Sequence, residues 1–412
     1  MSPSAVIAKY EHAYRQHPVR VQGPWGGCGQ PARKHVVHVI QDIAPKSGGP
    51  TAVVVDLAAQ QVKDGHRVTI VSASPASDRE TKVMLEARWA QLETRPDIRD
   101  APSRQGAAAF CTATLASLLP DIVHLHGIFG WSLRSAARWA RSRQTRVVCS
   151  THGMLHPAAL AIKRLKKLTY LRLFGDAVRM ADVLMTLNEE EANHARARFN
   201  PSAVVMENGV NPEAFFGHAP DMFLQSHPML AFRRYALFVG RLHPIKGLDQ
   251  LIRSYHLARS HGFDHTLVCI GPEEGATATL RTLISELGLQ DHVFLLPPMY
   301  GPAKQSALAG CSMFVHRPRY EGFGIAVVEA MAAGRPVVTT RLCRLDRAIR
   351  DGAILPADDT DKAFAESMLA VARDPTAAEA HARQTMQWVR DKLSWRVVAS
   401  QTMDIYQGAS TT

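Results

Sequence analysis

Residues 313–339 constrain the fold of this chain more than any other stretch. Met313–His316 forms a short apolar strand, and residues 321–324 form a glycine-rich turn. Ile325–Ala333 follows as an amphipathic helix, and Arg335–Thr339 as a second apolar strand. Strand, turn, helix and strand in this order make one unit of a parallel sheet. The chain is therefore predicted to be an α/β protein.

The turn in this unit is suited to binding an anion. The helix that follows it offers free backbone N–H groups, and Gly322 and Gly324 carry no side chain that would keep a ligand away. Glu321 and Glu329 stand eight residues apart, roughly 12 Å along a helix. This span is long enough for one carboxylate to meet the hydroxyls of a sugar and the other those of a ribose, with a diphosphate between them. Two solvated glutamates are the alternative, but the apolar neighbours of Glu329 disfavour it.

The segment 321–329 resembles the E-x7-E motif of retaining glycosyltransferases of the family 4 type. The resemblance extends from about residue 36 to about residue 408. It implies an α/β GT-B fold, with two facing Rossmann-like domains, parallel sheets and an interdomain cleft. It also assigns Glu321 to the transferred sugar and Glu329 to the ribose. The other donor-binding residues that it implies in this segment are Gly322, Phe323, Gly324 and Ile325.

A second motif opens the second half of the chain. Tyr235–Val239 is a predicted buried strand, and Gly240, Arg241 and Lys246 follow it on the loop before a helix. This spacing matches the family's Gly-Arg-x4-Lys-Gly, whose cations hold the diphosphate. Preorganised charges near a leaving diphosphate contribute about 2.7–4 kcal/mol each, by analogy with oxyanion holes. Solvated loop cations are the weaker alternative, because two separate motifs converge on the same ligand.

The first half opens with a strand, a tight turn and a helix. His35–Ile40 is the strand, and Thr51–Lys63 is the predicted helix. The turn at the carboxyl end of the strand needs glycine in any case, and the family resemblance adds that Gly48 and Gly49 approach the donor diphosphate or the acceptor. Neither the dinucleotide fingerprint nor a Walker loop occurs here, which argues against a dehydrogenase or an ATPase.

Two further strands of this half end in a histidine followed by glycine. His126 is a candidate to line the cleft on the acceptor side, whereas His124 is predicted to be a satisfied core residue. His152 is the stronger candidate, since it resembles the family's strand-end histidine that reaches the transferred sugar and diphosphate. A zinc site is disfavoured because no Cys or carboxylate joins these histidines at ligand spacing.

The length of 412 residues predicts two domains. The N-terminal acceptor domain would span residues 35–210, with a crossover helix at 394–408, and the C-terminal donor domain residues 235–393. Residues 211–234 are predicted to be an irregular linker, and residues 1–34 a flexible extension. The six cysteines form no Cys-x-x-Cys pair, which indicates reduced thiols in a cytosolic protein.

The net charge of +11 is concentrated in the first half. Up to residue 230 the sequence has 27 Lys and Arg against 19 Asp and Glu. This favours an anionic partner such as phospholipid or a lipid diphosphate, and no basic stretch has the aromatic pattern of a nucleic-acid reader. Residues 161–180 are predicted to form a basic helix, and its leucine-containing part, residues 161–174, would either lie on an anionic membrane or pack its leucines on the sheet with its lysines in water. The expected location is the cytoplasm, with a peripheral position at the inner face of the plasma membrane as the further expectation.

Three segments depart from simple patterns. Residues 341–346 replace a glycine-rich family loop, and Asn211 replaces an aspartate of the family's Asn-Gly-Val-Asp segment. Asp359–Asp361 resembles a metal-binding Asp-x-Asp motif, but it precedes a predicted helix and is assigned to capping.

The predicted function is transfer of a sugar from a nucleoside diphosphate sugar to a hydroxyl of a glycan or lipid-linked acceptor, with retention. The resemblance to exopolysaccharide and lipopolysaccharide enzymes implies a role in cell-surface polysaccharide synthesis. No residue is an obvious nucleophile, so front-face displacement is expected, without metal or cofactor. A nucleotide-sugar epimerase of the same architecture and a non-catalytic sugar-nucleotide or lipid-binding protein remain as alternatives.

Overall fold

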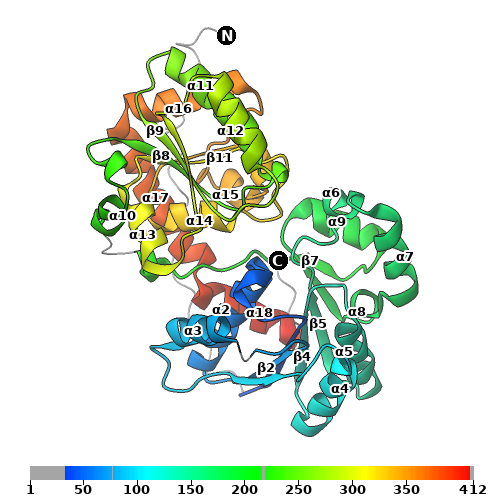
Figure 1. Cartoon of the computed structure of the whole chain (residues 1–412). Helices are drawn as coiled ribbons and strands as arrows, with labels where there is room; N and C mark the ends of the chain where they lie inside the picture. Colours follow the sequence, from blue (N-terminus) through cyan, green and yellow to red (C-terminus); the bar gives the residue numbers. More distant parts are fainter. Residues whose placement is uncertain (1–32, 77, 216–218, 409–412) are drawn as a thin grey trace. The chain divides into compact units, whose positions relative to one another are not determined.

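A computed structural model describes residues 33–76, 78–215 and 219–408. Within these residues the chain forms two compact units. The N-terminal unit runs to Gly209 and takes up the chain again from Trp395, and the C-terminal unit is Val210–Ser394 (Figure 1). The greater part of the predicted extension 1–34 lies outside the described residues.

The N-terminal unit is built on a parallel sheet of seven strands, in the order β3-β2-β1-β4-β5-β6-β7. The strands are β1 His35–Ile40, β2 Arg67–Ser72, β3 Asp97–Asp100, β4 Ile122–His126, β5 Arg146–Ser150, β6 Val183–Thr186 and β7 Ala203–Val205. The strand order reverses between β1 and β4, where His38 pairs with His124 in register. Ligands of such sheets bind at this switch point, beyond the carboxyl ends of the strands.

Helices cover both faces of this sheet. They are α2 Gly49–Lys63, α3 Arg79–Trp89, α4 Ala107–Leu118, α5 Trp131–Ser142, α6 Pro157–Ala161, α7 Arg164–Phe174, α8 Asp176–Arg179, α9 Glu189–Arg198 and α18 Trp395–Gln407. The final helix, α18, lies against α2 (Figure 1). A 3-10 turn, η1 Pro45–Ser47, precedes α2.

Two sequence expectations in this unit were wrong. Helix α2 begins at Gly49 and not at Thr51, because Pro50 fits the first turn of a helix, where its missing N–H has no partner to lose. The stretch 161–180, expected as continuous helix, is interrupted. Lys163 adopts the left-handed conformation between α6 and α7, with φ 56°, and Gly175 separates α7 from α8.

The C-terminal unit contains a parallel sheet of five strands, in the order β10-β9-β8-β11-β12. The strands are β8 Tyr235–Val239, β9 Thr266–Ile270, β10 Val293–Leu296, β11 Met313–His316 and β12 Val337–Thr339. Here the order reverses between β8 and β11, so the loops that follow these two strands meet at the switch point. The strand, turn, helix and strand predicted at 313–339 are all present.

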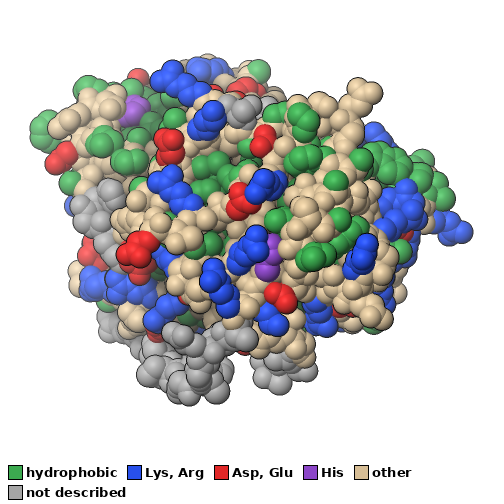
Figure 2. Space-filling model, turned by 90° about the horizontal axis from the view of Figure 1, so that it is seen from below, with side chains coloured by type: hydrophobic (Ala, Val, Ile, Leu, Met, Phe, Trp, Pro, Cys, Tyr) green, Lys and Arg blue, Asp and Glu red, His purple; other side chains and the backbone are tan. Residues whose placement is uncertain are grey.

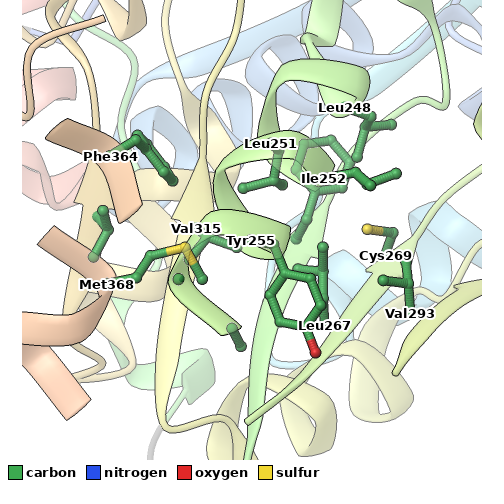
Figure 3. Close-up of a cluster of buried hydrophobic side chains, with 14 of the residues drawn as sticks. Leu248, Leu251, Ile252, Tyr255, Leu267, Cys269, Val293, Val315, Phe364 and Met368 are labelled. Carbon is green, nitrogen blue, oxygen red and sulfur yellow. The ribbon is translucent and has the colours of Figure 1, made fainter. Parts of the chain in front are cut away.

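The helices of this unit are α11 Leu248–Ser260, α12 Thr277–Glu286, α13 Gly301–Gly310, α14 Ile325–Ala332, α15 Asp346–Arg350, α16 Asp361–Arg373 and α17 Pro375–Leu393, with 3-10 turns η4 Pro244–Lys246 and η5 Arg341–Cys343. On one face of the sheet, α11 lies beside α16 (Figure 1). Their apolar side chains, among them Ile252 and Phe364, pack on Leu267 and Val315 of the strands (Figure 3). This core fixes the strand ends that carry the candidate site.

Residues 211–234 are not the irregular linker expected from the sequence. They contain η2 Pro212–Phe215, α10 Asp221–Ser226 and η3 Pro228–Leu230. Phe223 of α10 is 2% exposed, its ring centroid lies 5.5 Å from that of Tyr235, and its backbone N–H donates to Ser306 Oγ. Burial of this ring ties the segment to the C-terminal unit.

Five cysteines in the described part of the chain are free and buried: Cys111, Cys149, Cys269, Cys311 and Cys343. Cys28 lies outside the described residues. None of the described helices combines the length and the apolar character that crossing a bilayer requires.

Candidate active site

The switch point of the C-terminal sheet joins the two sequence motifs. Lys246, at the end of η4, and Glu321, in the glycine-rich turn, form an ion pair between Nζ and Oε2 although 75 residues separate them. Their side chains are only 13% and 17% exposed. The sheet order thus brings together the loop after β8 and the loop after β11, as the two motifs require if they bind one ligand.

A third residue, which the sequence analysis missed, completes this cluster. His316 ends β11, and its Nε2 lies 3.4 Å from Oε2 of Glu321. Burial raises the pKa of the Glu321 carboxyl, but the contact with His316 and the charge of Lys246 outweigh it and lower the pKa to about 2. Glu321 therefore stays ionised at neutral pH, as an acceptor of hydrogen bonds. The signal for His316 was its place as the last residue of a buried strand before the motif.

The loop that carries Lys246 is held in a fixed conformation. His243 Nδ1 accepts a hydrogen bond of 3.1 Å from the N–H of Ile245, at the start of η4. Gly247 has a φ of +65°, and a Cβ there would lie 2.1 Å from the carbonyl oxygen of Arg317. Only glycine fits this position, so the glycine that ends the motif is a packing requirement.

Arg241 lies apart from the Lys246–Glu321 pair. Its Nη1 is 2.6 Å from Oε2 of Glu274, in the loop after β9, and its side chain is 53% exposed. Exposed ion pairs of this kind contribute little to stability. Arg241 can therefore break its ion pair with Glu274 and bind a phosphate instead at a small cost in free energy. Gly240, just before it, donates its N–H to the carbonyl oxygen of Ile270 at 3.0 Å and so anchors the end of β8.

The second glutamate of the motif also has a lysine partner. Lys304 Nζ of α13 lies 2.6 Å from Oε1 of Glu329 in α14, and both side chains are largely buried. An unpaired carboxylate among the apolar neighbours of Glu329 would be costly in free energy, and the contact with Lys304 offsets that cost. In the sequence, the position of Lys304 in a short Gly- and Ala-rich helix gave no sign that it would pair with Glu329.

The glycine-rich turn is packed more tightly than the sequence suggested. A Cβ on Gly324 would lie 2.4 Å from Sγ of Cys343, and the N–H of Glu321 donates to the carbonyl oxygen of Leu342 at 3.2 Å. Phe323 is 6% exposed, and Ile325 begins α14. The atypical loop 341–346 is therefore a support for the turn, and Gly324 is needed there for close packing as well as for any ligand contact.

Asp359–Asp361 has a structural role. Thr360 Oγ1 accepts a hydrogen bond of 3.1 Å from the N–H of Ala363 and caps α16, which confirms the capping prediction. Both aspartates pair with Arg317, which is only 2% exposed. Their carboxylates thus neutralise a buried cation.

In the N-terminal unit the glycine turn lies at the start of α2. Gly48 has a φ of +77° and caps the helix that begins at Gly49, and both residues are exposed. Any residue with a Cβ would be strained at Gly48, so the turn itself requires glycine. The approach of a ligand to these residues remains a prediction.

The histidines at the ends of β4 and β5 are connected. His126 is 3% exposed, and its two ring nitrogens face His38 Nδ1 at 2.9 Å and His152 Nε2 at 3.1 Å. The predicted contact of His126 with an acceptor is untested, and the structure gives it two protein partners. His124 is fully buried and bonded to Tyr406 and Ser150, which confirms it as a satisfied core residue.

His152 lies on a loop held by a buried carboxylate that the sequence analysis missed. Glu191 accepts hydrogen bonds from Thr151 Oγ1 at 2.7 Å and from the N–H of Leu155 at 3.0 Å, so it holds both sides of His152. His152 itself has a φ of 51°, in the left-handed region that non-glycine residues seldom adopt. Such conformations persist where the surrounding structure imposes them, often at functional sites. The only sign of Glu191 in the sequence was its place in a run of three glutamates at the start of a helix.

His152 lines a pocket formed wholly within the N-terminal unit. The lining includes Glu207 and Asn208, from the segment that resembles the family's Asn-Gly-Val-Asp, and Trp395 from α18. A Cβ on Gly209 would lie 2.5 Å from the Trp395 ring, so the glycine of that segment serves packing. This pocket makes Glu207 and Asn208 neighbours of a candidate site residue.

Comparison with known families agrees with both halves of the chain. Residues 227–388 match the model of "Glycosyl transferases group 1", and residues 48–209 match "Glycosyl transferase 4-like domain". Each match falls on one of the two units.

Two curated relatives are informative. The GDP-mannose:cellobiosyl-diphosphopolyprenol alpha-mannosyltransferase of Xanthomonas campestris is 30% identical over 387 residues, covering 91% of this chain and 97% of that protein. The phosphatidyl-myo-inositol mannosyltransferase of Mycobacterium leprae is 33% identical over 215 residues, covering 51% and 54%.

Solved structures share the fold at low identity. HepE of Anabaena in complex with UDP and glucose superposes with a TM-score of 0.72 at 16% identity, covering 91% of this chain and 100% of that one. WaaG, a glycosyltransferase involved in lipopolysaccharide biosynthesis, superposes with a TM-score of 0.65 at 16% identity, covering 91% and 100%. The fold is therefore GT-B, and the chain belongs to the group 1 glycosyltransferases of the family 4 type.

Proposed function

We propose that this chain is a retaining α-mannosyltransferase that uses GDP-mannose and extends a glycan carried on a polyprenyl diphosphate, in the synthesis of a cell-surface polysaccharide. The observation that carries the proposal is the largely buried Lys246–Glu321 ion pair at the switch point of the C-terminal sheet. Similarity over 97% of the Xanthomonas mannosyltransferase supports the choice of donor and acceptor class.

The charges of the C-terminal unit suit the departure of a nucleoside diphosphate. As the bond between the sugar and the phosphate breaks, negative charge grows on the phosphate oxygens, and Lys246 and Arg241 supply fixed positive charge for it. Glu321, ionised and tied to Lys246, would accept hydrogen bonds from sugar hydroxyls. Glu329 would bind the ribose hydroxyls by exchanging its bond to Lys304. These residues supply the charge that the step needs without a metal ion.

The environment of Glu321 also supports retention without a covalent intermediate. A nucleophilic carboxylate must be free to attack the anomeric carbon, whereas one oxygen of Glu321 already faces both Lys246 and His316. In the proposed route the acceptor hydroxyl attacks from the face that the diphosphate leaves, and a phosphate oxygen takes its proton. His152 is proposed to contact the transferred sugar.

A position at an anionic membrane surface is part of the proposal. Around α7 several apolar side chains are exposed, with Leu165 at 84%, Leu173 at 55% and Ile162 at 51%. Lys163, Arg164 and Lys166 lie between them in the sequence and are also exposed. Not all leucines of this helix are exposed, since Leu171 is buried in the core of the N-terminal unit. Figure 2 shows one face of the molecule on which Lys and Arg side chains stand among exposed hydrophobic ones.

The membrane contact is tested by flotation with vesicles that contain anionic lipid. Leu165→Glu removes an apolar side chain and adds a negative charge, so vesicle binding should fall by about tenfold or more. Leu119→Glu is the matched control, because Leu119 is 72% exposed in the same unit but outside this segment. Equal loss in both variants, or binding to neutral vesicles alone, would contradict the membrane proposal.

The enzymatic proposal is tested with purified protein, a panel of nucleotide sugars and a synthetic lipid diphosphate that carries a short glycan. Mannose should be transferred from GDP-mannose, and NMR of the product should show an α linkage. Incubation of the donor alone distinguishes an epimerase, since only an epimerase changes the sugar without an acceptor. Transfer from UDP-glucose but not from GDP-mannose would reject the donor assignment, and a β linkage would reject retention.

A further inference from the structure

A continuous network of buried hydrogen bonds runs through the N-terminal unit and ends at His152. It joins β1, β4, α2 and α18, and all of its members except His152, which is partly exposed, are 4% exposed or less. The members are Gln61, His38, His126, His152, Tyr406 and His124.

One branch of the network runs from an amide to His152. Gln61 Oε1 lies 2.7 Å from His38 Nε2, and an amide oxygen has no hydrogen to donate, so His38 carries its proton on Nε2. A neutral His38 must then accept at Nδ1, 2.9 Å from His126 Nε2, which donates. The same argument applies once more, because His126 Nδ1 accepts at 3.1 Å from His152 Nε2. The proton of His152 is thereby fixed on Nε2. Its Nδ1 is then unprotonated, with a lone pair that can accept a hydrogen bond.

The other branch agrees with this direction. Gln61 Nε2 donates to the Tyr406 hydroxyl at 3.3 Å, and that hydroxyl donates to His124 Nδ1 at 2.6 Å. His124 Nε2 then donates to Ser150 Oγ at 2.8 Å, and the Ser150 hydroxyl faces Met185 Sδ at 3.9 Å. Each hydrogen bond of the two branches joins one donor to one acceptor, so the orientation of the Gln61 amide sets the direction of the whole network.

The imidazoles of the network are neutral. Burial lowers the pKa of His38 and of His152 to about 4. Burial and then the neighbouring histidines hold the pKa of His126 well below its usual range. Neutral rings have one donor and one acceptor each, which is what a directed chain requires.

A metal ion is the competing explanation for this cluster. His38, His124 and His126 place ligand-type nitrogens within 4.8 Å of one another. However, His124 already uses its two nitrogens with Tyr406 and Ser150, and His38 uses its own with Gln61 and His126. An ion would have to replace several of these bonds, so the hydrogen-bonded network accounts for the geometry better.

We propose that Gln61, His38 and His126 are positioning residues that hold His152 as a neutral imidazole with its proton on Nε2 and its Nδ1 ready to accept a hydrogen bond from a substrate hydroxyl. In this state His152 recognises a sugar hydroxyl and does not donate to a phosphate oxygen. The contact with the sugar rests on the proposed function, whereas the tautomer does not.

The tautomer is measured directly by long-range 1H–15N NMR of protein labelled with 15N in its histidine rings. Protonated and unprotonated ring nitrogens give signals in separate regions, and the signals of His152 are those lost in His152→Gln. A proton on Nε2 at pH 7.5 supports the proposal. A proton on Nδ1 would mean that the network runs the opposite way and would overturn it. So would a shift of these signals on adding one equivalent of Zn2+, which would identify a metal site.

Variants then test the control exerted by Gln61. Gln61→Leu removes the acceptor for His38 Nε2–H, so His152 should lose its single tautomer and give signals of both forms. Ser150→Ala is the matched variant, because it removes a buried hydroxyl from the other branch and should leave the His152 signals as they are. An unchanged tautomer in a folded Gln61→Leu protein would show that Gln61 does not set it.

Kinetics separates this inference from the proposed function. In Gln61→Leu, kcat/KM for the donor sugar should fall about two- to tenfold, as for the loss of one neutral hydrogen bond, while the affinity for free GDP stays unchanged. An equal loss of GDP affinity would place His152 against the diphosphate and reject the sugar contact. Absence of any mannosyl transfer by the wild-type protein would reject the proposed function but leave the tautomer result standing.

Discussion

The two sheets of this protein carry different chemistry at the same topological position. At the switch point of the N-terminal sheet, His38, His126 and His152 are neutral and bonded to one another. At the switch point of the C-terminal sheet, Lys246 and Glu321 are charged and paired. One architecture thus supports a directed chain of hydrogen bonds in one unit and a set of fixed charges in the other.

Under the proposed function, the difference follows from the chemistry of the group that each unit would bind. A leaving diphosphate gains charge, so it is stabilised by cations that are already in place. A sugar hydroxyl stays neutral, and a directed acceptor recognises it without the cost of burying a charge. Two further cations of the C-terminal unit also lie beside carboxylates, in the Arg241–Glu274 and Lys304–Glu329 pairs.

The largest effect expected is that of removing the central cation. Lys246→Ala should lower kcat by about a hundredfold or more, because the charge that opposes the growing negative charge is lost. Steady-state kinetics with GDP-mannose measures it, with Lys362→Ala, an exposed lysine of the same unit, as the control. A rate within a few-fold of wild type would remove Lys246 from the diphosphate site.

A smaller effect is expected at the ribose. Glu329→Ala removes a charge-assisted hydrogen bond of about 1.5–3 kcal/mol, which corresponds to a loss of donor affinity of roughly 10- to 100-fold. Calorimetric titration with GDP measures this loss. Glu329→Gln keeps the volume of the side chain and guards against a packing defect beside Lys304. Unchanged affinity in both variants would show that Glu329 does not bind the nucleotide.

The charged cluster should also make stability depend on pH in the acid range. The pKa of Glu321 is about 2 in the folded protein, against an ordinary value of 4.5. Its contribution is therefore complete above pH 4.5 and is lost as the pH falls towards 2, with a slope of up to about 1.4 kcal/mol per pH unit. Denaturant unfolding between pH 6 and 3 should show a shallower slope for Glu321→Gln than for wild type. Parallel curves would mean that Glu321 is not held in its ionised form.

The smallest effect belongs to the exposed pair. Glu274→Ala frees Arg241 from an ion pair of about 0–1 kcal/mol, so GDP affinity should rise by no more than about fivefold. Arg241→Ala should weaken it. A large loss of affinity in Glu274→Ala would instead identify Glu274 as a nucleotide ligand.

The sequence was most informative where local signals coincide. Buried apolar runs, glycine turns and helix caps predicted nearly all strands around the site, and two motifs predicted that Lys246 and Glu321 serve one ligand. The failures have local causes. Residues 211–234 were expected to be an irregular linker because the sequence shows no regular pattern there, yet burial of Phe223 orders short helices in this segment. The stretch 161–180 looked continuous because a left-handed Lys163 leaves no mark in the pattern.

By itself the sequence determined that this chain forms parallel α/β units with a glycine turn and cations beyond the strand ends, because these features depend on neighbours along the chain. Only the tertiary structure decided the partners of those residues. Lys304 with Glu329 and Gln61 with His38 are contacts between separate elements. Their distances depend on strand order and helix packing, which bring together residues that no local pattern connects.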